Sequence, residues 1–164
     1  MSVLDAPFVS ETRRNHALEH ATIHILSGRF PGRGMAGHSN PTGFFLIGNV
    51  AIEDIRSATS EALARLQNGE SRLAIHPGCG TNYAVTGALA GLFTIIGMIG
   101  TRNTRERLER FPQLMALAML AFGLGQPLGM ALQKQVTTQA DPGGLSIVDV
   151  YSVSKTVHRV VTRA

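Results

Sequence analysis

The sequence predicts an α+β protein in which a small helix/sheet domain carries an inserted two-helix transmembrane hairpin. Three observations predict this class: an amphipathic helical segment near the N-terminus, short runs of strand length near both ends, and two long uncharged stretches between them. We expect an α/β metal-binding domain over residues 1–82, the hairpin over 83–132, and a C-terminal β tail over 133–164 that packs on the first domain.

The amino-acid composition indicates which partners and which cellular compartment suit the protein. The apolar share of 44% is close to the globular average, so the uneven distribution of apolar residues carries the membrane signal. The charge is +4 and the arginines are scattered, which suits anionic lipid and predicts no nucleic-acid partner. Cys79 is the single cysteine, so an intrachain disulfide is excluded and a reducing compartment is favoured. The first twelve residues lack the pattern of a cleaved signal peptide.

The first domain alternates helical and extended segments. Residues 13–27 have apolar positions on one helical face, and residues 52–67 begin with acidic residues and end at Asn68-Gly69, so both predict helices. The apolar run 43–50 and the segment 72–76 predict strands. The Gly- and Pro-rich segment 30–41 predicts a loop.

Two stretches without charge, residues 83–100 and 114–132, predict the membrane hairpin. At about 1.5 Å per residue each spans roughly 27–29 Å, close to the thickness of a bilayer core. The arginine-rich linker, 101–113, must stay in water or at headgroups, and recurring glycines suit close helix packing in lipid. The alternative is a hairpin buried in a soluble core or in an oligomer interface.

The sequence also predicts strands in the C-terminal tail and bears on the orientation of the protein in the membrane. Residues 145–153 and 156–161 are rich in β-branched residues and predict strands, with His158 at the surface. The positive-inside rule would place the linker in the cytoplasm, whereas exporting the first domain without a signal sequence is difficult. We favour an inner (cytoplasmic) membrane protein with two spans and a cytoplasmic soluble domain.

The segment His16-Ala17-Leu18-Glu19-His20 is the sharpest chemical signal. On a helix, His16 and His20 lie one turn apart on the same face and can bind one metal ion, with Glu19 nearby as a general base. The order H-x-x-E-H is that of the inverted zincins. The alternative is a polar helix face with two solvated histidines.

A third ligand is expected from the segment His76-Pro77-Gly78-Cys79-Gly80-Thr81, because zinc takes His, Cys or carboxylate ligands. Cys79, between two glycines, is the first candidate and His76 competes with it. Four further residues are candidates for contact with substrate or with the metal ligands: His24, His38, His76 and Thr81. Zinc fits two imidazoles and a thiolate, and Fe²⁺ or Co²⁺ suit the same donors.

These motifs, in this order, resemble S-ribosylhomocysteine lyase, whose fold is shared with mitochondrial processing peptidase and pitrilysin-type peptidases. The resemblance covers residues 13–82 and rests on His16 to His20, the Thr42-Gly43-Phe44-Phe45 strand and Cys79-Gly80-Thr81. It implies a metallohydrolase-like fold, with His16, His20 and Cys79 as metal ligands, Glu19 beside the metal, and a homodimer. Asn40 stands where the lyase has a catalytic cysteine. The whole chain also looks like a bacterial membrane-protein family with H-A-L-E-H and C-G-T-N signatures.

Three functions follow from these features. The first is a membrane-tethered zinc-dependent hydrolase, peptidase- or lyase-like, acting on a peptide or small molecule, with Glu19 as base and Asn40 and His38 as candidates to orient substrate or stabilise an oxyanion. The second is a non-catalytic, metal-stabilised accessory subunit of a membrane complex. The third, a pigment- or haem-binding subunit, is the least favoured because residues 83–132 contain no histidine.

Overall fold

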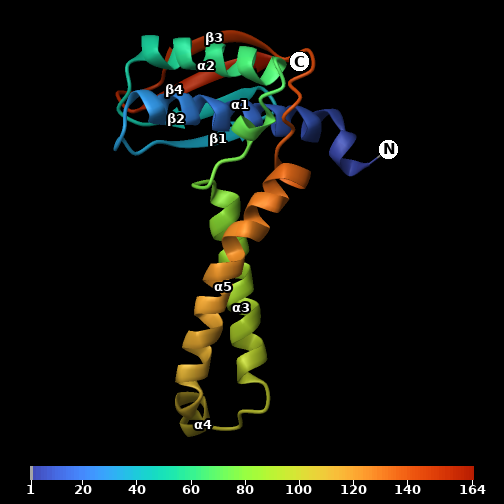
Figure 1. Ribbon diagram of the computed structural model, residues 1–164, viewed down its shortest axis with the longest axis vertical. Helices are drawn as coiled ribbons and strands as arrows, with labels where there is room; N and C mark the ends of the chain where they lie inside the picture. Colours follow the sequence, from blue (N-terminus) through green and yellow to red (C-terminus); the bar gives the residue numbers. More distant parts are fainter. Residues whose placement is uncertain (1) are drawn as a thin grey trace. The chain divides into compact units, whose positions relative to one another are not determined.

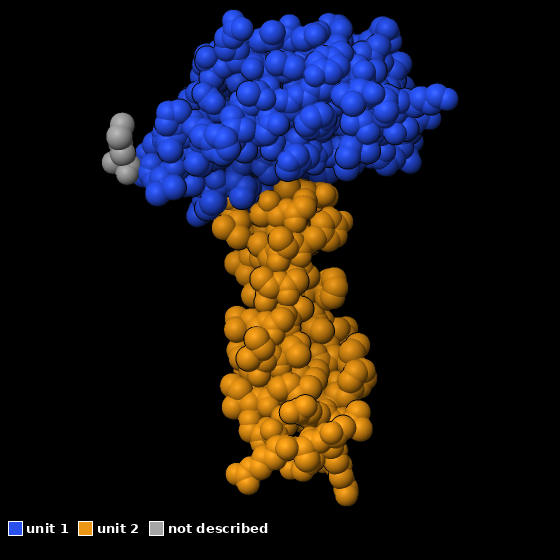
Figure 2. Space-filling view, turned by 180° about the vertical axis from the view of Figure 1, so that it is seen from behind, with its two compact units in different colours: residues 1–76, 133–164 blue, residues 77–132 orange. Residues whose placement is uncertain are grey.

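The structure, a computed structural model, describes residues 2–164 and confirms a mixed fold of helices and a small antiparallel sheet. The contacts divide the chain into two compact units, coloured separately in Figure 2. The first unit is formed by residues 1–76 and 133–164, and the second by residues 77–132. The first unit is therefore built from both ends of the sequence, and the second is an insertion into it.

The first unit contains a four-stranded sheet in the order β1-β2-β4-β3, with every neighbouring pair antiparallel. The strands are β1 (Ala36–Asn40), β2 (Gly43–Ile47), β3 (Ser146–Ser152) and β4 (Val157–Arg163). The N-terminal and C-terminal hairpins are joined by β2 and β4, with Phe44 opposite Val160 and Leu46 opposite His158. The C-terminal tail thus completes the sheet begun near the N-terminus (Figure 1).

Two helices of the first unit, α1 (Pro7–Arg29) and α2 (Ile52–Gln67), pack on each other and on the sheet (Figure 1). The helix α1 contacts β1 and β2, while α2 contacts β3. The alternation of side chains along a strand places Phe44, Leu46 and Val160 on this face, and all three are buried with Leu18 of α1 and Ile55 of α2. Burying each such side chain contributes about 1.5–3 kcal/mol.

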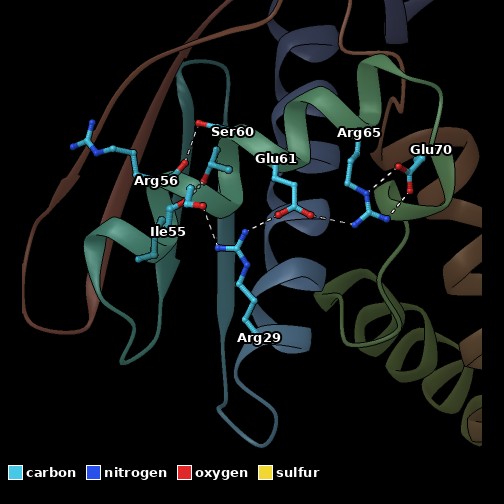
Figure 3. A network of polar contacts seen from close by, with 9 residues as sticks. Arg29, Ile55, Arg56, Ser60, Glu61, Arg65 and Glu70 are labelled. Atoms are coloured by element: carbon cyan, nitrogen blue, oxygen red, sulfur yellow. Dashed lines mark hydrogen bonds and ion pairs between the residues drawn. The ribbon is translucent and has the colours of Figure 1, made fainter.

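The solvent side of α2 carries a chain of ion pairs (Figure 3). Glu61 accepts from Arg29 at 2.6 Å and lies 3.5 Å from Arg65, which also binds Glu70 at 2.6 Å. These side chains are partly exposed to solvent, so each pair contributes at most about 1 kcal/mol. Arg56 differs because its guanidinium donates to the backbone carbonyl of Val150 and ties α2 to β3.

The second unit is a helical hairpin formed by α3 (Gly80–Met98), the short α4 (Thr104–Glu109) and α5 (Phe111–Leu132). The helices α3 and α5 lie side by side (Figure 1). Glycines of α5 permit close contact, because a Cβ at Gly125 would lie 1.9 Å from Thr86 Oγ1 and one at Gly129 would lie 2.3 Å from Asn82 Oδ1. By length and composition alone, both helices could cross a membrane, and most of their side chains are exposed within the structure.

Several expectations are confirmed, and three are wrong. The helix at 52–67 has the expected limits, and the strand at 43–50 ends earlier, at Ile47. The expected strand at 72–76 is instead a 3-10 helix, η2 (Ser71–Ala74), followed by extended residues. The physical reason is that the carbonyls of Ala74 and Ile75 pair with the imidazoles of His20 and His24 and not with a neighbouring strand.

The two other errors concern the sheet. The expected loop at 30–41 contains β1, whose glycine-containing sequence pairs with β2 as an edge strand. His158, expected at the surface, is only 3% exposed, because β4 is a central strand and this side chain points to the covered face. Its Nδ1 lies 3.0 Å from Ser152 Oγ. The pairing of β1 and the burial of His158 both depend on the order of the strands, which the local sequence does not reveal.

Candidate metal site

His16 and His20 lie one turn apart on α1, as the spacing predicts. Their ring centroids are 4.3 Å apart, His20 is almost fully buried, and His16 is partly buried. The helix extends without a break on both sides of the pair, from Pro7 to Arg29. The two imidazoles are therefore presented from a rigid element, as metal ligands require.

Backbone carbonyls fix the orientation of both rings. The Nδ1 atom of His16 lies 2.9 Å from the carbonyl oxygen of Thr137, and that of His20 lies 2.8 Å from the carbonyl oxygen of Ala74. Because a carbonyl only accepts hydrogen bonds, the proton belongs on Nδ1 in both rings, which places the lone pair on Nε2. Histidines that bind metal typically have this arrangement, with the second ring nitrogen donating to a carbonyl or carboxylate.

Cys79 lies three residues after His76, in the segment by which the chain leaves the first unit. It is the N-cap of α3, and its Sγ accepts a hydrogen bond from the backbone N–H of Thr81 at 3.5 Å. A helix N-terminus stabilises the thiolate, which is the form that binds metal. The Thr81 hydroxyl lies 3.4 Å from the same sulfur.

The ligand atoms of His16, His20 and Cys79 all lie within 4.8 Å of one another. Donor atoms around tetrahedral zinc are about 3.3–3.7 Å apart, given a Zn–N distance near 2.0 Å and a Zn–S distance near 2.3 Å. These residues could hold a transition metal and leave a fourth position for water or substrate.

Glu19 is buried against the sheet. Ser39 of β1 donates its hydroxyl to Glu19 Oε2 at 2.5 Å. A Cβ on Gly37 would lie 2.2 Å from Glu19 Oε1, so the absent side chain leaves room for this carboxylate. The strand β1 therefore fixes the position of Glu19, although the sequence of β1 predicted a loop.

Asn40 and His38 are not in this cluster. The Ser39 side chain faces α1 at Glu19, and side chains alternate along a strand, so His38 and Asn40 point to the opposite face of the sheet. Asn40 Oδ1 accepts hydrogen bonds from Thr42 and from Arg159, and His38 is exposed. Their expected role in holding an oxyanion at the metal has no support in this geometry.

His24 and His76 extend the row of imidazoles beyond His20. The ring of His76 lies 4.8 Å from that of His24 and 5.7 Å from that of His20. His24 Nε2 lies 2.8 Å from the carbonyl of Ile75. Burial, followed by the neighbouring His24 and His20, lowers the pKa of His76 from 6.5 to about 4, so its ring is neutral at pH 7.

Some supporting groups had no signal in the sequence. The carbonyls of Thr137 and Ala74 act through the backbone, so residue type does not reveal them. Gln133 accepts from the His76 backbone N–H at 2.9 Å and donates to its carbonyl at 3.1 Å, and it is fully buried. The sequence shows only that Gln133 directly follows a long apolar segment, and its burial follows from the structure.

The chain belongs to a family described as a domain of unknown function, DUF6391, whose sequence profile matches residues 11–150. An uncharacterised protein of Picosynechococcus sp. is 34% identical over 150 residues, covering 84% of this chain and 70% of that relative. No solved structure matches this chain.

These comparisons overturn the resemblance to S-ribosylhomocysteine lyase and the processing peptidases. The family that matches is DUF6391, the matched relative is described as uncharacterised, and neither comparison shows a lyase or metallopeptidase family. The short motifs that carried the resemblance, H-x-x-E-H and C-G-T, are too brief to define descent. The candidate metal site therefore stands only on its own geometry.

Proposed function

We propose that this chain is a membrane-tethered, zinc-dependent hydrolase in which His16, His20 and Cys79 hold the metal. The observation that carries the proposal is the pairing of both Nδ1 atoms with backbone carbonyls, at 2.9 and 2.8 Å, in a cluster whose three ligand atoms lie within 4.8 Å of one another. Two solvated histidines would not need backbone carbonyl partners. A thiolate ligand also suits a reducing compartment, which supports a cytoplasmic soluble domain in this proposal.

Zinc bound by three protein ligands lowers the pKa of a water in the fourth position toward about 7. Glu19 adjoins His20 in the same turn of α1, and the Ser39 hydroxyl orients its carboxylate. Glu19 is the candidate to accept the proton of the water as that water attacks an ester or amide carbonyl. The substrate class is a carbonyl compound small enough to reach a partly buried site.

The tether in this proposal is the hairpin of α3 and α5. Exposed large apolar side chains cover both helices, among them Leu92, Ile95, Ile96, Met119, Leu120 and Phe122. A core helix of a soluble protein buries most of its apolar side chains, whereas these helices bury few. Lipid is the partner that fits this surface.

The metal site is tested by elemental analysis of detergent-purified full chain. We expect about one zinc per chain in the wild type and loss of the metal in His16→Ala, His20→Ala and Cys79→Ser. His38→Ala is the matched control, because His38 is exposed on the other face of the sheet and should leave the zinc in place. Freshly purified, folded wild type without metal would refute the site.

Catalysis is tested separately with a 4-nitrophenyl ester as probe. Glu19→Gln should keep the zinc and should lower the hydrolysis rate at least about 100-fold, because a general base usually contributes that much. An unchanged rate in this variant would refute the role of Glu19.

A second function has its own support. The Asn40 side chain points away from the cluster, so the amide expected to stabilise an oxyanion does not lie beside the candidate ligands. A metal-stabilised accessory subunit of a membrane complex needs no such group. Zinc that is retained and stabilising in a chain without hydrolytic activity would favour this function.

A further inference from the structure

The segment from the end of α3 to the first turn of α5, residues 99–113, includes α4 and is called the tip turn here. It contains four arginines, Arg102, Arg105, Arg107 and Arg110, and two glutamates, Glu106 and Glu109. If the hairpin spans a bilayer, as the proposed function requires, this turn lies where the two spans end. The contacts that each charged group makes within the turn then decide which charges remain available to a partner.

Both glutamates and two of the arginines are already engaged within the tip turn. Glu106 accepts from the backbone N–H of Arg102 at 2.7 Å and from the Asn103 amide at 2.9 Å. Glu109 pairs with Arg105 at 2.9 Å. Arg110 Nη1 donates to the carbonyls of Gly97 and Ile99 and so caps the C-terminal end of α3.

Arg102 and Arg107 are the two remaining cations, and both are exposed. Across residues 2–164, the structure gives neither guanidinium an ion pair or a hydrogen bond. Each guanidinium carries five N–H donors in a planar fork that matches phosphate oxygens. The tip turn thus presents two uncompensated positive charges.

Large apolar side chains stand beside these arginines. Ile99, Leu108 and Phe111 are 67%, 69% and 59% exposed. A turn surrounded only by water gains nothing from such side chains, whereas a turn at the boundary of headgroups and acyl chains buries them. A shallow polar hollow beside them is lined by Gly100, Arg102, Glu106, Glu109, Arg110 and Gln113.

We propose that the tip turn binds anionic phospholipid headgroups, with Arg102 and Arg107 donating to the phosphate oxygens and Leu108 and Phe111 entering the acyl boundary. The charge of the turn and its exposed apolar residues complement this one partner. Arg110 is not assigned to the lipid because it caps α3, and Arg105 is not assigned because it pairs with Glu109.

The test uses the full chain in a neutral detergent, titrated with short-chain phosphatidylglycerol, phosphatidylcholine or glycerol phosphate, and lipid adducts are measured by native mass spectrometry. The wild type should prefer phosphatidylglycerol, and the double variant Arg102→Gln, Arg107→Gln should bind it roughly 10- to 30-fold more weakly. The matched control is Arg72→Gln, Arg163→Gln, which removes the same charge from exposed positions of the first unit and should change nothing.

Three results would overturn the proposal. They are equal binding of phosphatidylglycerol and phosphatidylcholine, equal loss in both double variants, or binding of glycerol phosphate as strong as that of the lipid. Alkaline extraction of membranes from expressing cells separates this proposal from the underlying one. A chain that is washed from the membrane refutes the tether, and the tip-turn proposal fails with it. A chain that stays in the membrane but has no preference for anionic lipid refutes only the tip turn.

Discussion

The Nδ1 atom of His20 on α1 lies 2.8 Å from the carbonyl oxygen of Ala74, although 54 residues separate them in the chain. This one contact fixes the tautomer of a buried imidazole and satisfies a carbonyl at the end of η2. His16 has the same relationship with Thr137, from the opposite end of the sequence. The candidate ligands are thus oriented by two distant segments.

Metal binding should stabilise the fold, because an ion that binds only the native state shifts the unfolding equilibrium. At a zinc concentration 100 times the dissociation constant, the gain is about 2.7 kcal/mol. The thermal midpoint of the wild type should therefore rise with zinc and fall with a chelator. His20→Ala should show neither change, and a response of equal size in that variant would place the zinc elsewhere.

Gly37→Ala should destabilise the first unit. The added Cβ would lie 2.2 Å from Glu19 Oε1, so the buried carboxylate must move, at a cost of about 1–3 kcal/mol. Gly34→Ala is the matched control, because no atom lies within 4 Å of its Cβ position and the backbone there is not left-handed. Thermal unfolding followed by circular dichroism measures both, and identical midpoints would contradict the packing of Glu19 on β1.

Asn15→Ala should destabilise the first unit by removing the hydrogen bonds between α1 and the β1–β2 turn. The Asn15 amide donates to the carbonyls of Asn40 and Pro41, both at 2.9 Å, and its oxygen accepts from the Thr162 hydroxyl at 2.6 Å. Each buried group left without a partner costs about 1–3 kcal/mol.

The control for this change is Asn49→Ala, because Asn49 is exposed and accepts its hydrogen bond from Arg33 through the backbone carbonyl. We expect a large drop in the thermal midpoint for Asn15→Ala and almost none for Asn49→Ala. A small effect of Asn15→Ala would mean that water replaces all three hydrogen bonds.

Gly125→Ala should loosen the hairpin. Its Cβ would lie 1.9 Å from Thr86 Oγ1 and 2.9 Å from Thr86 Cα, so α3 and α5 must move apart. Gly123→Ala meets nothing within 4 Å and should leave the hairpin unchanged or stabilise it by up to about 1 kcal/mol through helix propensity. Loss of helicity on titration with a denaturing detergent compares the two variants, and the reverse order would refute the packing of α3 on α5.

Local periodicity predicted the helices well. Residues 52–67 match α2, and residues 13–27 lie inside α1, which begins earlier because Pro7 suits the first turn of a helix. The two uncharged segments coincide closely with α3 and α5. Whether these helices cross a membrane stays a prediction.

Segments whose structure depends on a distant partner were less predictable. Residues 36–40 form a strand only because β2 offers a pairing edge, and residues 72–76 form no strand because side chains of α1 take their carbonyls. Asn40 was a candidate site residue by position, yet strand alternation turns its side chain to Arg159. Such outcomes depend on contacts that a local pattern does not contain.

The sequence by itself determined the spacing of His16 and His20, the isolation of Cys79 as the one thiol, and two apolar helices around a charged turn, because each depends on residues near one another in the chain. Tertiary structure alone decided that Thr137, Ala74, Ser39 and Gly37 shape the surroundings of the ligands and Glu19. The physical reason is that a backbone carbonyl or an absent Cβ acts through its place in space, and that place is set by how the sheet joins the two ends of the chain.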